Sequence, residues 1–461
     1  MRTKKRYHFS ATQLITLSFV ILILLGALLL NTPAASNDGH SIGFLDALFT
    51  ATSASCVTGL VVVNTLEHWT LFGQLVILAL IQFGALGFIS IFIASLKLFN
   101  RRISLENSIV IQTAYGQNKI GGMGPFIAKT VKITLTCEAI GAAILTLLFH
   151  RAQSISWGRA VYEGIFHAIS AFCNAGFDVL GADSLLPFGD SWAILLTIGV
   201  LIIIGGLGFP VIIELLTKFR QHREWSLRHR LEMLSVHSKI ALLMTGILLL
   251  LGTVIFLILE WSNDQTLGRL SVSHKVLNSL FQSITLRTAG YYSIDQAGLT
   301  ELSKLLSAVL MVIGGSPAGT AGGIKTVTIA VVLIAVHSAL RGEPKIVGFK
   351  RTLPISLLQK ALTVMTAFIL IALTAIIILN FSEQSSAFNH SLLDLVYEVS
   401  SAMGTVGVTT GITPHLSQIG KIVIMLCMFV GRLSPITVIV ALGRRLKQKN
   451  YCYPEETVVI G

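Results

Sequence analysis

The sequence predicts an all-α integral membrane protein with four tandem helix–pore loop–helix repeats, eight spanning helices in all, around one pseudo-four-fold axis. Of its 461 residues, 53% are hydrophobic and 12% are charged, about half the charged fraction of soluble proteins. Eight apolar runs are long enough to cross a bilayer, and between successive pairs of runs lies a short glycine-centred segment. The glycines of these segments are 117, 114 and 117 residues apart, which indicates a repeated architecture. The apolar runs lie at about 14–30, 71–96, 126–149, 192–216, 239–259, 305–336, 355–379 and 419–442.

Each repeat should contain a spanning helix, a short half-helix, a glycine strand and a second helix. The half-helices share a pattern in which an acidic or amide residue precedes an aromatic residue by three positions: Asp46, Glu163, Asn278 and Asp394. We expect these residues near helix N-termini, where side-chain oxygens cap free N–H groups and carboxylates complement the dipole. The expected boundaries are 10–98, 126–220, 238–340 and 355–446, followed by a cytoplasmic tail at 447–461.

The positions of the charges predict the topology. The net charge is +12, and 25 of the 34 Lys and Arg residues fall in five regions. Cytoplasmic loops are enriched in Lys and Arg, so both termini and three basic loops should be cytoplasmic. In a soluble protein this charge would suggest nucleic acid. Its placement between apolar runs excludes that partner and leaves anionic lipid or a soluble protein. The basic regions are the N-terminus to Arg6, 97–132, 218–239, 341–360 and 444–449.

The first apolar run is similar to a signal peptide, because basic residues precede it and Ala34-Ala35 follows it. It is long for a signal core and supplies the first helix of the repeat, so we expect it to be retained. The cysteines lack metal-ligand spacing, and we expect them to be free thiols. They are Cys56, Cys137, Cys173, Cys427 and Cys452.

The glycine strands have the composition of a cation filter. Thr405-Val406-Gly407 resembles the start of a potassium-channel filter, where backbone carbonyls replace the hydration shell of the ion. A half-helix that runs inward directs its negative end towards such a site. We expect potassium at the filter carbonyls and no other metal. The expected ion-binding strands are Cys56, Val57, Thr58 and Gly59; Cys173, Asn174, Ala175 and Gly176; Arg287, Thr288, Ala289 and Gly290; and Gly404, Thr405, Val406 and Gly407.

An arginine in the third strand departs from this pattern. Cys56, Cys173 and Gly404 occupy the positions equivalent to Arg287. We expect Arg287 to point away from the axis and to tie the third strand to the protein, for example through an acidic residue. An anion path is the alternative.

The second helix of the third repeat contains a glycine-rich interruption. Five glycines and a proline within ten residues are incompatible with a regular helix. Backbone of this kind must face a cavity or be buried in protein, so we expect a movable gating loop below the filter. A phosphate-binding loop is the alternative, but the required spacing is absent. The loop comprises Gly314, Gly315, Ser316, Pro317, Ala318, Gly319, Thr320, Ala321, Gly322 and Gly323.

Two charges lie at the depth of this loop. They are Lys325, directly after the loop, and Arg432 in the last apolar run. Intramembrane charges are costly and usually functional, and we expect Arg432 to hydrogen-bond the carbonyls of the loop. Glycines in the other second helices, at Gly84, Gly205-Gly206 and Gly431, are expected to allow close helix packing.

With these motifs, residues 10–446 resemble the Trk/Ktr/HKT superfamily of potassium transporters, and within it the bacterial Ktr membrane subunits. Gly59 occupies the position where sodium-selective plant relatives carry Ser, which implies potassium. The resemblance implies a homodimer in a bacterial plasma membrane, with one pore per protomer. It also implies a cytosolic octameric regulator ring of the KtrA/KtrC kind, which binds ATP/ADP or NAD(H), and often stimulation by sodium.

A carrier with alternating access and a membrane enzyme are the competing functions. Carriers often contain inverted repeats, whereas the four repeats here share one orientation, which favours a pore. His167, His337 and His390 are isolated in the sequence and form no catalytic cluster. We therefore expect a translocation subunit without enzymatic activity.

Overall fold

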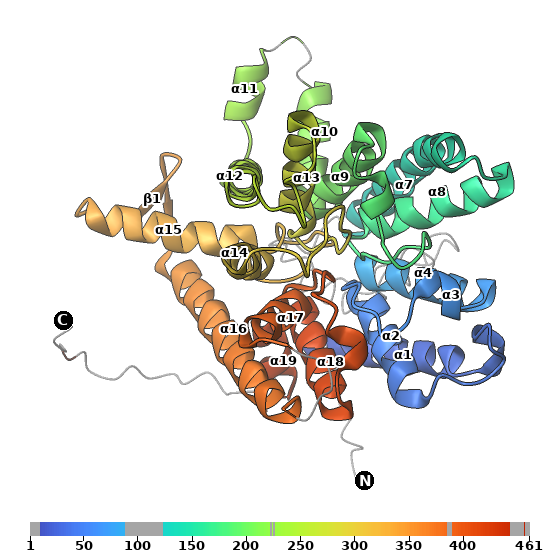
Figure 1. Cartoon of the computed structure of the whole chain (residues 1–461). Coiled ribbons are helices and arrows are strands. Elements are labelled where there is room, and N and C mark those ends of the chain that lie inside the picture. Colours follow the sequence, from blue (N-terminus) through green and yellow to red (C-terminus); the bar gives the residue numbers. More distant parts are fainter. Residues whose placement is uncertain are drawn as a thin grey trace, which may run out of the picture.

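The computed structural model describes residues 10–87, 123–221, 224, 226–384, 390–442 and 456. The described chain is mostly helical, and Figure 1 shows four sectors that follow one another around a common centre, coloured from blue to red. The two described strands, β1 (Ile346–Gly348) and β2 (Arg351–Leu353), form one antiparallel hairpin. The predicted all-α class is confirmed. Most of the basic loop at 97–132, Cys452 and the C-terminal tail except Glu456 lie outside the described residues.

The helices of the four sectors follow one another along the chain. The first has α1 (Ala11–Leu30), η1 (Pro33–Ala35), α2 (Phe44–Cys56), α3 (Thr65–His68) and α4 (Leu71–Leu86). The second has α7 (Met123–Gln153), α8 (Trp157–Phe172), η2 (Leu186–Phe188), α9 (Trp192–Gly206) and α10 (Phe209–Gln221), and α11 (Leu227–Glu232) follows it. The third has α12 (Val236–Leu259), α13 (Val272–Thr285), α14 (Glu301–Val312) and α15 (Thr326–Leu340). The fourth has α16 (Ile355–Ser382), α17 (Leu392–Gly404), η3 (Thr413–His415), α18 (Gln418–Leu433) and α19 (Pro435–Leu442).

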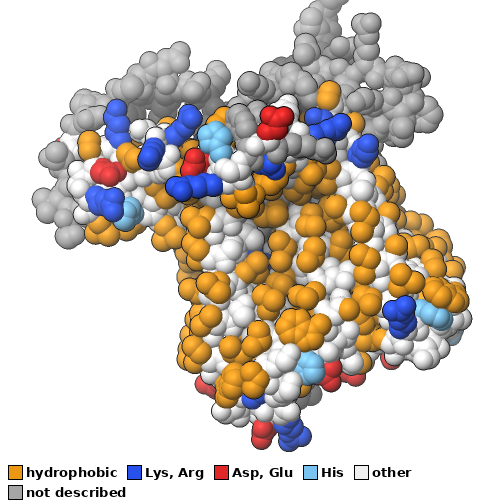
Figure 2. All heavy atoms as spheres, turned by 90° about the horizontal axis from the view of Figure 1, so that it is seen from above, with side chains coloured by type: hydrophobic (Ala, Val, Ile, Leu, Met, Phe, Trp, Pro, Cys, Tyr) orange, Lys and Arg blue, Asp and Glu red, His pale blue; other side chains and the backbone are white. Residues whose placement is uncertain are grey.

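The first helices of the sectors are the clearest membrane spans. Within the described residues, α1, α7, α12 and α16 are each long and apolar enough to cross a bilayer. The pairs α9–α10 and α18–α19 bend by 98° at short breaks, and each can count as one further span. Figure 2 shows hydrophobic side chains over the middle of the surface and charged side chains towards its two ends. The protein is therefore a multi-pass membrane protein.

The second helices are interrupted in more sectors than the sequence predicted. Gly208 has φ 89° between α9 and α10, and Ser434 has φ 75° between α18 and α19. A residue with positive φ cannot continue a right-handed helix, and Pro210 and Pro435 follow close behind the two breaks. The expectation of continuous helices at 192–216 and 419–442 is therefore wrong. In the first sector, α4 ends before Gly87, and the rest of the predicted run lies outside the described residues.

The half-helices α2, α8, α13 and α17 begin at different caps from those predicted. Their N-cap residues are Gly43, Ser156, Ser271 and Ser391. Each of the three serines accepts a hydrogen bond from the backbone N–H three residues later, which satisfies one of the free donors of the first turn. Of the four predicted capping residues, Asp46 and Asp394 lie in first turns, and Asp394 accepts a hydrogen bond from the Ser391 backbone N–H at 3.0 Å, which completes a capping box. Glu163 and Asn278 lie well inside their helices.

Three of those four polar residues also tie neighbouring sectors together. Each contacts the start of the preceding sector's second helix or the loop before it, and the fourth sector contacts the first in the same way. Such contacts fix the half-helices relative to one another. The ties are Asp46 Oδ1 to Lys421 Nζ at 2.6 Å, Asp394 Oδ1 to Lys304 Nζ at 3.1 Å, and Asn278 Nδ2 to the Gly189 carbonyl at 2.9 Å.

A buried carboxylate connects α12 and α14 of the third sector. Glu260, at the end of α12, accepts hydrogen bonds from the backbone and hydroxyl of Thr300 at 3.1 and 2.8 Å, and from Thr266 at 2.6 Å. Burial acts to raise the pKa of Glu260, but these hydrogen bonds outweigh it and the pKa is lowered. The carboxylate is therefore charged and holds the start of α14. Glu383, at the end of α16, binds Ser417 in the same way.

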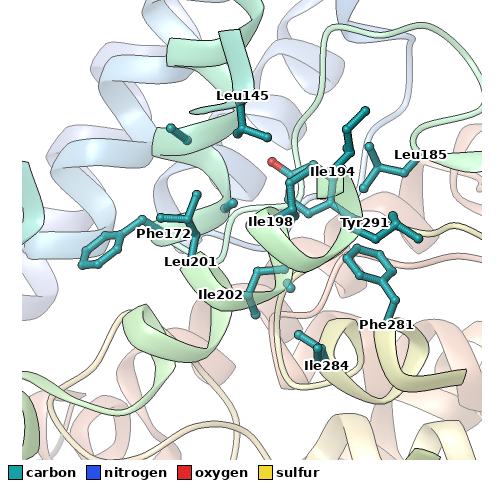
Figure 3. Close-up of a cluster of buried hydrophobic side chains, with 14 of the residues drawn as sticks. Leu145, Phe172, Leu185, Ile194, Ile198, Leu201, Ile202, Phe281, Ile284 and Tyr291 are labelled. Carbon is teal, nitrogen blue, oxygen red and sulfur yellow. The ribbon is translucent and has the colours of Figure 1, made fainter. Parts of the chain in front are cut away.

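A dense apolar core supports the centre from the side of the second and third sectors. Figure 3 shows Phe172, Leu201 and Ile202 near Phe281 and Tyr291 within one cluster of buried side chains. Lipid tails are as apolar as these residues, so burying the residues away from lipid gives no hydrophobic gain. The cluster stabilises the protein through van der Waals contacts between closely packed side chains. This packing sets the positions of α8, α9 and α13, whose ends carry the site.

Candidate functional site

The four glycine strands have one backbone conformation. The residue two positions before each glycine is left-handed, with φ between 51° and 72°, and each glycine has φ between 70° and 100°. A left-handed residue other than glycine costs roughly 1–2 kcal/mol, so the surrounding structure must impose this conformation. The left-handed residues are Val57, Asn174, Thr288 and Thr405, and the glycines are Gly59, Gly176, Gly290 and Gly407.

The glycines of the four strands meet in a closed ring. A Cβ atom on Gly59 would lie 2.6 Å from the Ala175 carbonyl oxygen, and one on Gly176 would lie 2.8 Å from that of Ala289. A Cβ atom on Gly290 would lie 2.7 Å from the Val406 oxygen, and one on Gly407 would overlap the Thr58 oxygen. Each strand therefore borders the next, and the fourth borders the first. The carbonyl groups that precede the glycines surround one narrow space.

Hydroxyl groups outside the predicted ion-binding strands support these strands. Ser53, Ser170, Thr285 and Ser401 are fully buried, and they lie five or six residues before the ring glycines. Ser53 and Ser401 accept hydrogen bonds from the N–H of Gly59 and Gly407 at 3.1 and 3.0 Å. Ser170 and Thr285 donate to the Phe177 and Tyr291 carbonyls at 2.6 and 2.5 Å. The motifs did not predict this role, although aligning the repeats would have revealed the recurring hydroxyl position.

A buried acidic residue stands behind the second strand. The thiol of Cys173 lies 3.7 Å from Glu138 Oε1 and 3.5 Å from Gln82 Oε1. Gln82 Nε2 donates to Glu138 Oε2 at 3.3 Å, which links α4, α7 and the strand. Glu138 was not among the predicted site residues, and the signal that could have identified it is a lone acid within the apolar run 126–149.

Arg287 lies behind the third strand, and its partner differs from the acid that the sequence suggested. Its side chain is 9% exposed, and Nη2 donates to the Thr245 hydroxyl of α12 at 3.4 Å. No ion pair among the described residues includes Arg287. The arginine thus ties the strand to α12 through a hydroxyl and not through an acid.

A funnel opens from the ring on the side away from the ends of the half-helices. Its volume is about 270 Å³, and all four ring glycines contribute to its wall. Asp178, Tyr292 and Thr409 are among its polar lining residues. Burial raises the pKa of Asp178 to about 6, although a hydrogen bond from the Leu180 backbone N–H opposes the shift.

The predicted loop 314–323 folds as non-helical backbone between α14 and α15. Gly314 N–H donates to the Ile324 carbonyl at 2.9 Å, and Ile324 N–H donates to the Val312 carbonyl at 3.0 Å, so the two ends of the loop lie side by side. Lys325 Nζ donates to the Ala321 and Gly322 carbonyls at 2.6 and 3.3 Å. Lys325 therefore satisfies carbonyls of its own loop.

The loop is also bonded to the second sector. Ser316 N–H donates to the Gly206 carbonyl at 2.9 Å, and Thr320 N–H donates to that of Gly205 at 3.2 Å. The Thr320 hydroxyl lies 3.2 Å from the Phe172 oxygen and 3.0 Å from the Asn174 side-chain amide. Orienting this amide with its nitrogen towards Thr320 satisfies both residues. The loop thereby contacts the second strand.

The other members of the loop are packed tightly against their surroundings. A Cβ atom on Gly208 would lie 2.5 Å from the Pro317 oxygen, and the Ala318 carbonyl accepts a hydrogen bond from Phe209 N–H at 3.0 Å. A Cβ atom on Gly322 would overlap the Thr405 hydroxyl, so the loop also lies against the fourth strand.

Arg432 connects three sectors through backbone carbonyls. Its Nη1 donates to the Thr320 carbonyl of the loop. Its Nη2 donates to the carbonyls of Gly84 and Ala85, at the end of α4, at 2.7 and 3.0 Å. Guanidinium N–H groups can serve several acceptors at once, and this side chain fixes the loop between α4 and α18.

The glycines of the other second helices lie against the ends of the half-helices. A Cβ atom on Gly84, Gly205 or Gly431 would overlap the carbonyl group of Ser55, Phe172 or Met403, respectively. Small residues of this kind let membrane helices approach closely. These contacts fix the positions of the half-helix ends and of the strands that follow them.

Backbone carbonyls around one narrow opening in a helical membrane protein are typical of cation-translocating membrane proteins. Comparison with known proteins agrees, since the family described as TrkH, Cation transport protein, matches residues 3–452. The chain therefore belongs to the TrkH family of cation transport proteins, and it is a transporter and not an enzyme. This confirms the resemblance to the Trk/Ktr/HKT superfamily that the sequence motifs carried.

Several relatives are similar over nearly the full chain. The potassium/sodium uptake protein NtpJ of Enterococcus hirae is 39% identical over 100% of this chain and 99% of its own length. The Ktr system potassium uptake protein B of Bacillus subtilis is 36% identical over 99% and 98%. The crystal structure of the potassium transporter TrkH from Vibrio parahaemolyticus covers 96% of this chain and 87% of its own with a TM-score of 0.70. Its 20% sequence identity supports the fold alone.

Proposed function

We propose that the protein is the ion-translocating subunit of a potassium uptake system, and that potassium passes through the ring. The closed ring formed by the Thr58, Ala175, Ala289 and Val406 carbonyls carries this proposal. A dehydrated potassium ion needs such oxygens in place of its water shell, and the half-helices direct their negative ends towards it. The names of the relatives from Bacillus subtilis and Enterococcus hirae, both uptake proteins for potassium, support the choice of ion.

The proposal includes the organisation expected from the sequence. Four repeats at 10–98, 126–220, 238–340 and 355–446 supply eight spans, some of them broken, and the 447–461 tail follows. Both termini and the basic loops face the cytoplasm, in keeping with the excess of Lys and Arg there. The funnel with Asp178 is then the outer mouth of the path.

Ion flux into liposomes that contain only this protein tests the proposal. We expect rubidium, a substitute for potassium, to enter down its gradient without any coupled solute. Sodium is measured in parallel, because the Enterococcus hirae relative is named for both ions. Protein-free liposomes give the background. Flux that requires a second solute would favour a carrier with alternating access, and sodium flux equal to that of rubidium would contradict the choice of potassium.

We further propose that the loop 314–323 is the gate and that the described contacts hold it closed. Arg432 and Thr320 support this role, because together they fasten the loop to three other elements directly beside the second strand. Opening would move the loop away from the path. Lys325 would stay with the loop, because it bonds to the carbonyls of Ala321 and Gly322.

We propose that a separate regulator protein controls the gate. The Ktr systems named among the relatives support a multi-subunit assembly. We infer a homodimer of this chain on a cytosolic octameric ring that binds ATP/ADP or NAD(H), with sodium as a stimulator. Arg228 and Arg230, on the exposed helix α11, are candidates for the contact.

Co-purification with the co-encoded soluble partner tests this assembly. Reversing the charges of Arg228 and Arg230 should weaken the complex, and the wild-type complex should weaken as salt rises, because exposed ion pairs are screened. Equal recovery of the partner with the wild type and with the charge-reversed variant at every salt concentration would contradict this contact. That result would not bear on the proposal that ions pass through the ring.

A further inference from the structure

An open groove lies between α7 and α10, away from the ring and the loop. Its volume is about 820 Å³, and one wall comes from the N-terminal half of α7 and the other from the last turns of α10. The sequence predicted basic loops at this end of the protein but no site. The lining residues are Lys129, Lys132, Ile133, Thr136, Cys137, Ile213, Leu216, Thr217, Arg220 and Gln221.

Three cationic side chains define the polar part of this groove. Lys129 and Lys132 are exposed and lie one turn apart on α7, and Arg220 is exposed in the last turn of α10. None of the ion pairs recorded within the described ranges includes any of the three. The groove therefore offers positive charge to a ligand from two helices.

The remainder of the groove is mainly apolar. Ile133 and Ile213 are partly buried, and the Leu216 side chain is 57% exposed. Both walls continue into membrane segments, since α7 is a candidate span and α10 belongs to the bent pair with α9. Figure 2 shows Lys and Arg side chains gathered at one end of the molecule, directly beside the hydrophobic surface. A ligand for such a groove needs an anionic head and a hydrocarbon tail.

We propose that this groove binds an anionic glycerophospholipid of the cytoplasmic leaflet. The lipid phosphate would lie among Lys129, Lys132 and Arg220, where the guanidinium can bind two phosphate oxygens at once. An acyl chain would follow Ile133, Ile213 and Leu216. Basic pockets between membrane helices on the cytoplasmic side recognise anionic headgroups in this manner.

Occupancy would also have a structural consequence. The bound lipid would bridge α7 and α10, and α10 begins at the break where Phe209 N–H donates to the Ala318 carbonyl of the loop. The lipid would therefore hold the segment on which one side of the loop rests.

Lipid retention by the purified full-length protein, measured by native mass spectrometry, tests the site. Phosphatidylglycerol and phosphatidylcholine with the same acyl chains are added separately, and we expect at least about tenfold tighter retention of phosphatidylglycerol. The triple variant Lys129→Gln, Lys132→Gln, Arg220→Gln should lose this preference. The matched control, Lys345→Gln, Lys350→Gln, Arg351→Gln, removes three exposed charges beside the β-hairpin and should keep it.

A second variant separates a lipid from a bare phosphate ligand. Ile213→Trp adds bulk to the apolar part without changing charge, and it should lower phosphatidylglycerol retention severalfold. Inorganic phosphate should not displace the lipid. Equal retention of both lipids, equal loss in both triple variants, or displacement by inorganic phosphate would each overturn the proposal. Phosphatidylglycerol retention unchanged in the groove triple variant would also overturn it and would favour a cytosolic protein as the occupant.

Discussion

The ring strands and the loop 314–323 are both non-helical backbone within the membrane, but they are held in different ways. Each strand continues from its own half-helix, repeats the same dihedral pattern and is supported by a hydroxyl five or six residues earlier. Apart from backbone hydrogen bonds to the second sector, the loop depends on two individual side chains, Arg432 of α18 and its own Thr320. The four strands support one another in the same way and leave no room for a side chain on the ring glycines. A loop that is held by a few individual contacts can move when those contacts break. This difference suits a rigid filter and a movable gate.

A side chain on a ring glycine should give the largest effect. In Gly59→Ser or Gly407→Ser, the new Cβ would meet a backbone carbonyl of the adjacent strand, and the backbone would keep an unfavourable positive φ. We expect at least about a tenfold loss of preference for potassium over sodium, because the carbonyl ring must widen. Rubidium and sodium uptake into liposomes measures the ratio.

Gly411→Ser is the matched control for the ring. Gly411 has φ 94°, close to the 100° of Gly407, but a Cβ atom there would meet nothing within 4 Å. If strain alone were responsible, this variant would be equally impaired. Unchanged growth of an uptake-deficient strain carrying Gly59→Ser at limiting potassium would contradict the role of the ring.

Removing the arginine that fastens the loop should change flux and leave selectivity intact. Arg432→Ala deletes the hydrogen bonds to the Thr320, Gly84 and Ala85 carbonyls. Hydrogen bonds to charged groups contribute roughly 1.5–3 kcal/mol each, so losing one can shift a closed–open equilibrium by about tenfold or more. We expect higher rubidium flux in the absence of a regulator.

Arg432→Lys should give an intermediate result, since an ammonium group keeps the charge but lacks the planar fork. Shortening the loop should act in the same direction as Arg432→Ala. Wild-type flux in Arg432→Ala and in the shortened-loop protein, with a normal yield of folded protein, would rule out the gating role.

Thr320 offers a way to separate the two regions, because its hydroxyl touches the second strand. Thr320→Val keeps the shape but leaves the Asn174 amide and the Phe172 carbonyl without this partner, whereas Thr320→Ser retains it. One hydrogen bond contributes about 1 kcal/mol, so we expect about a fivefold rise in flux for Thr320→Val. A fall in the rubidium-to-sodium ratio should accompany the rise, unlike in Arg432→Ala.

Parallel measurements of flux and ion ratio on both Thr320 variants give the test. Thr320→Ser should behave as wild type in both. If Thr320→Val raised flux with an unchanged ion ratio, the loop and the strand would be independent of each other. If both variants were equally altered, packing around the methyl group would be the cause instead of the hydrogen bond.

Much of this comparison follows from the sequence, because it rests on period and composition. The spacing of Gly59, Gly176, Gly290 and Gly407 locates the strands, and the glycine content of 314–323 locates the loop. Both signals are local, and the first recurs at a fixed period along the chain. The positions of the long first helices follow from the lengths of the apolar runs in the same way.

The failures concern contacts between distant residues. Asp46 looked like a helix cap, but its partner is Lys421, 375 positions later. The sequence suggests an acidic partner for Arg287, but Arg287 donates to the hydroxyl of Thr245. Ser434 carries no local sign of its positive φ apart from the proline that follows it. Apolar composition alone cannot show a break that tertiary packing imposes.

The smallest expected effect concerns the outer mouth of the ring and its dependence on pH. Burial raises the pKa of Asp178 to about 6, so the carboxyl group is charged above that pH and neutral below it. A negative charge in a narrow funnel raises the local cation concentration. Uptake from dilute potassium should therefore fall about two- to threefold as the outside pH drops from about 7 to about 5.

Asp178→Asn should remove this dependence and hold uptake at the lower value, since the amide keeps an acceptor for Leu180 N–H but carries no charge. Asp183→Asn is the control, because Asp183 is exposed and does not line the funnel. At saturating potassium the effect of pH should vanish, because the concentration at the mouth no longer limits flux. A pH profile of Asp178→Asn that matches the wild type at low potassium would assign the titration to another group.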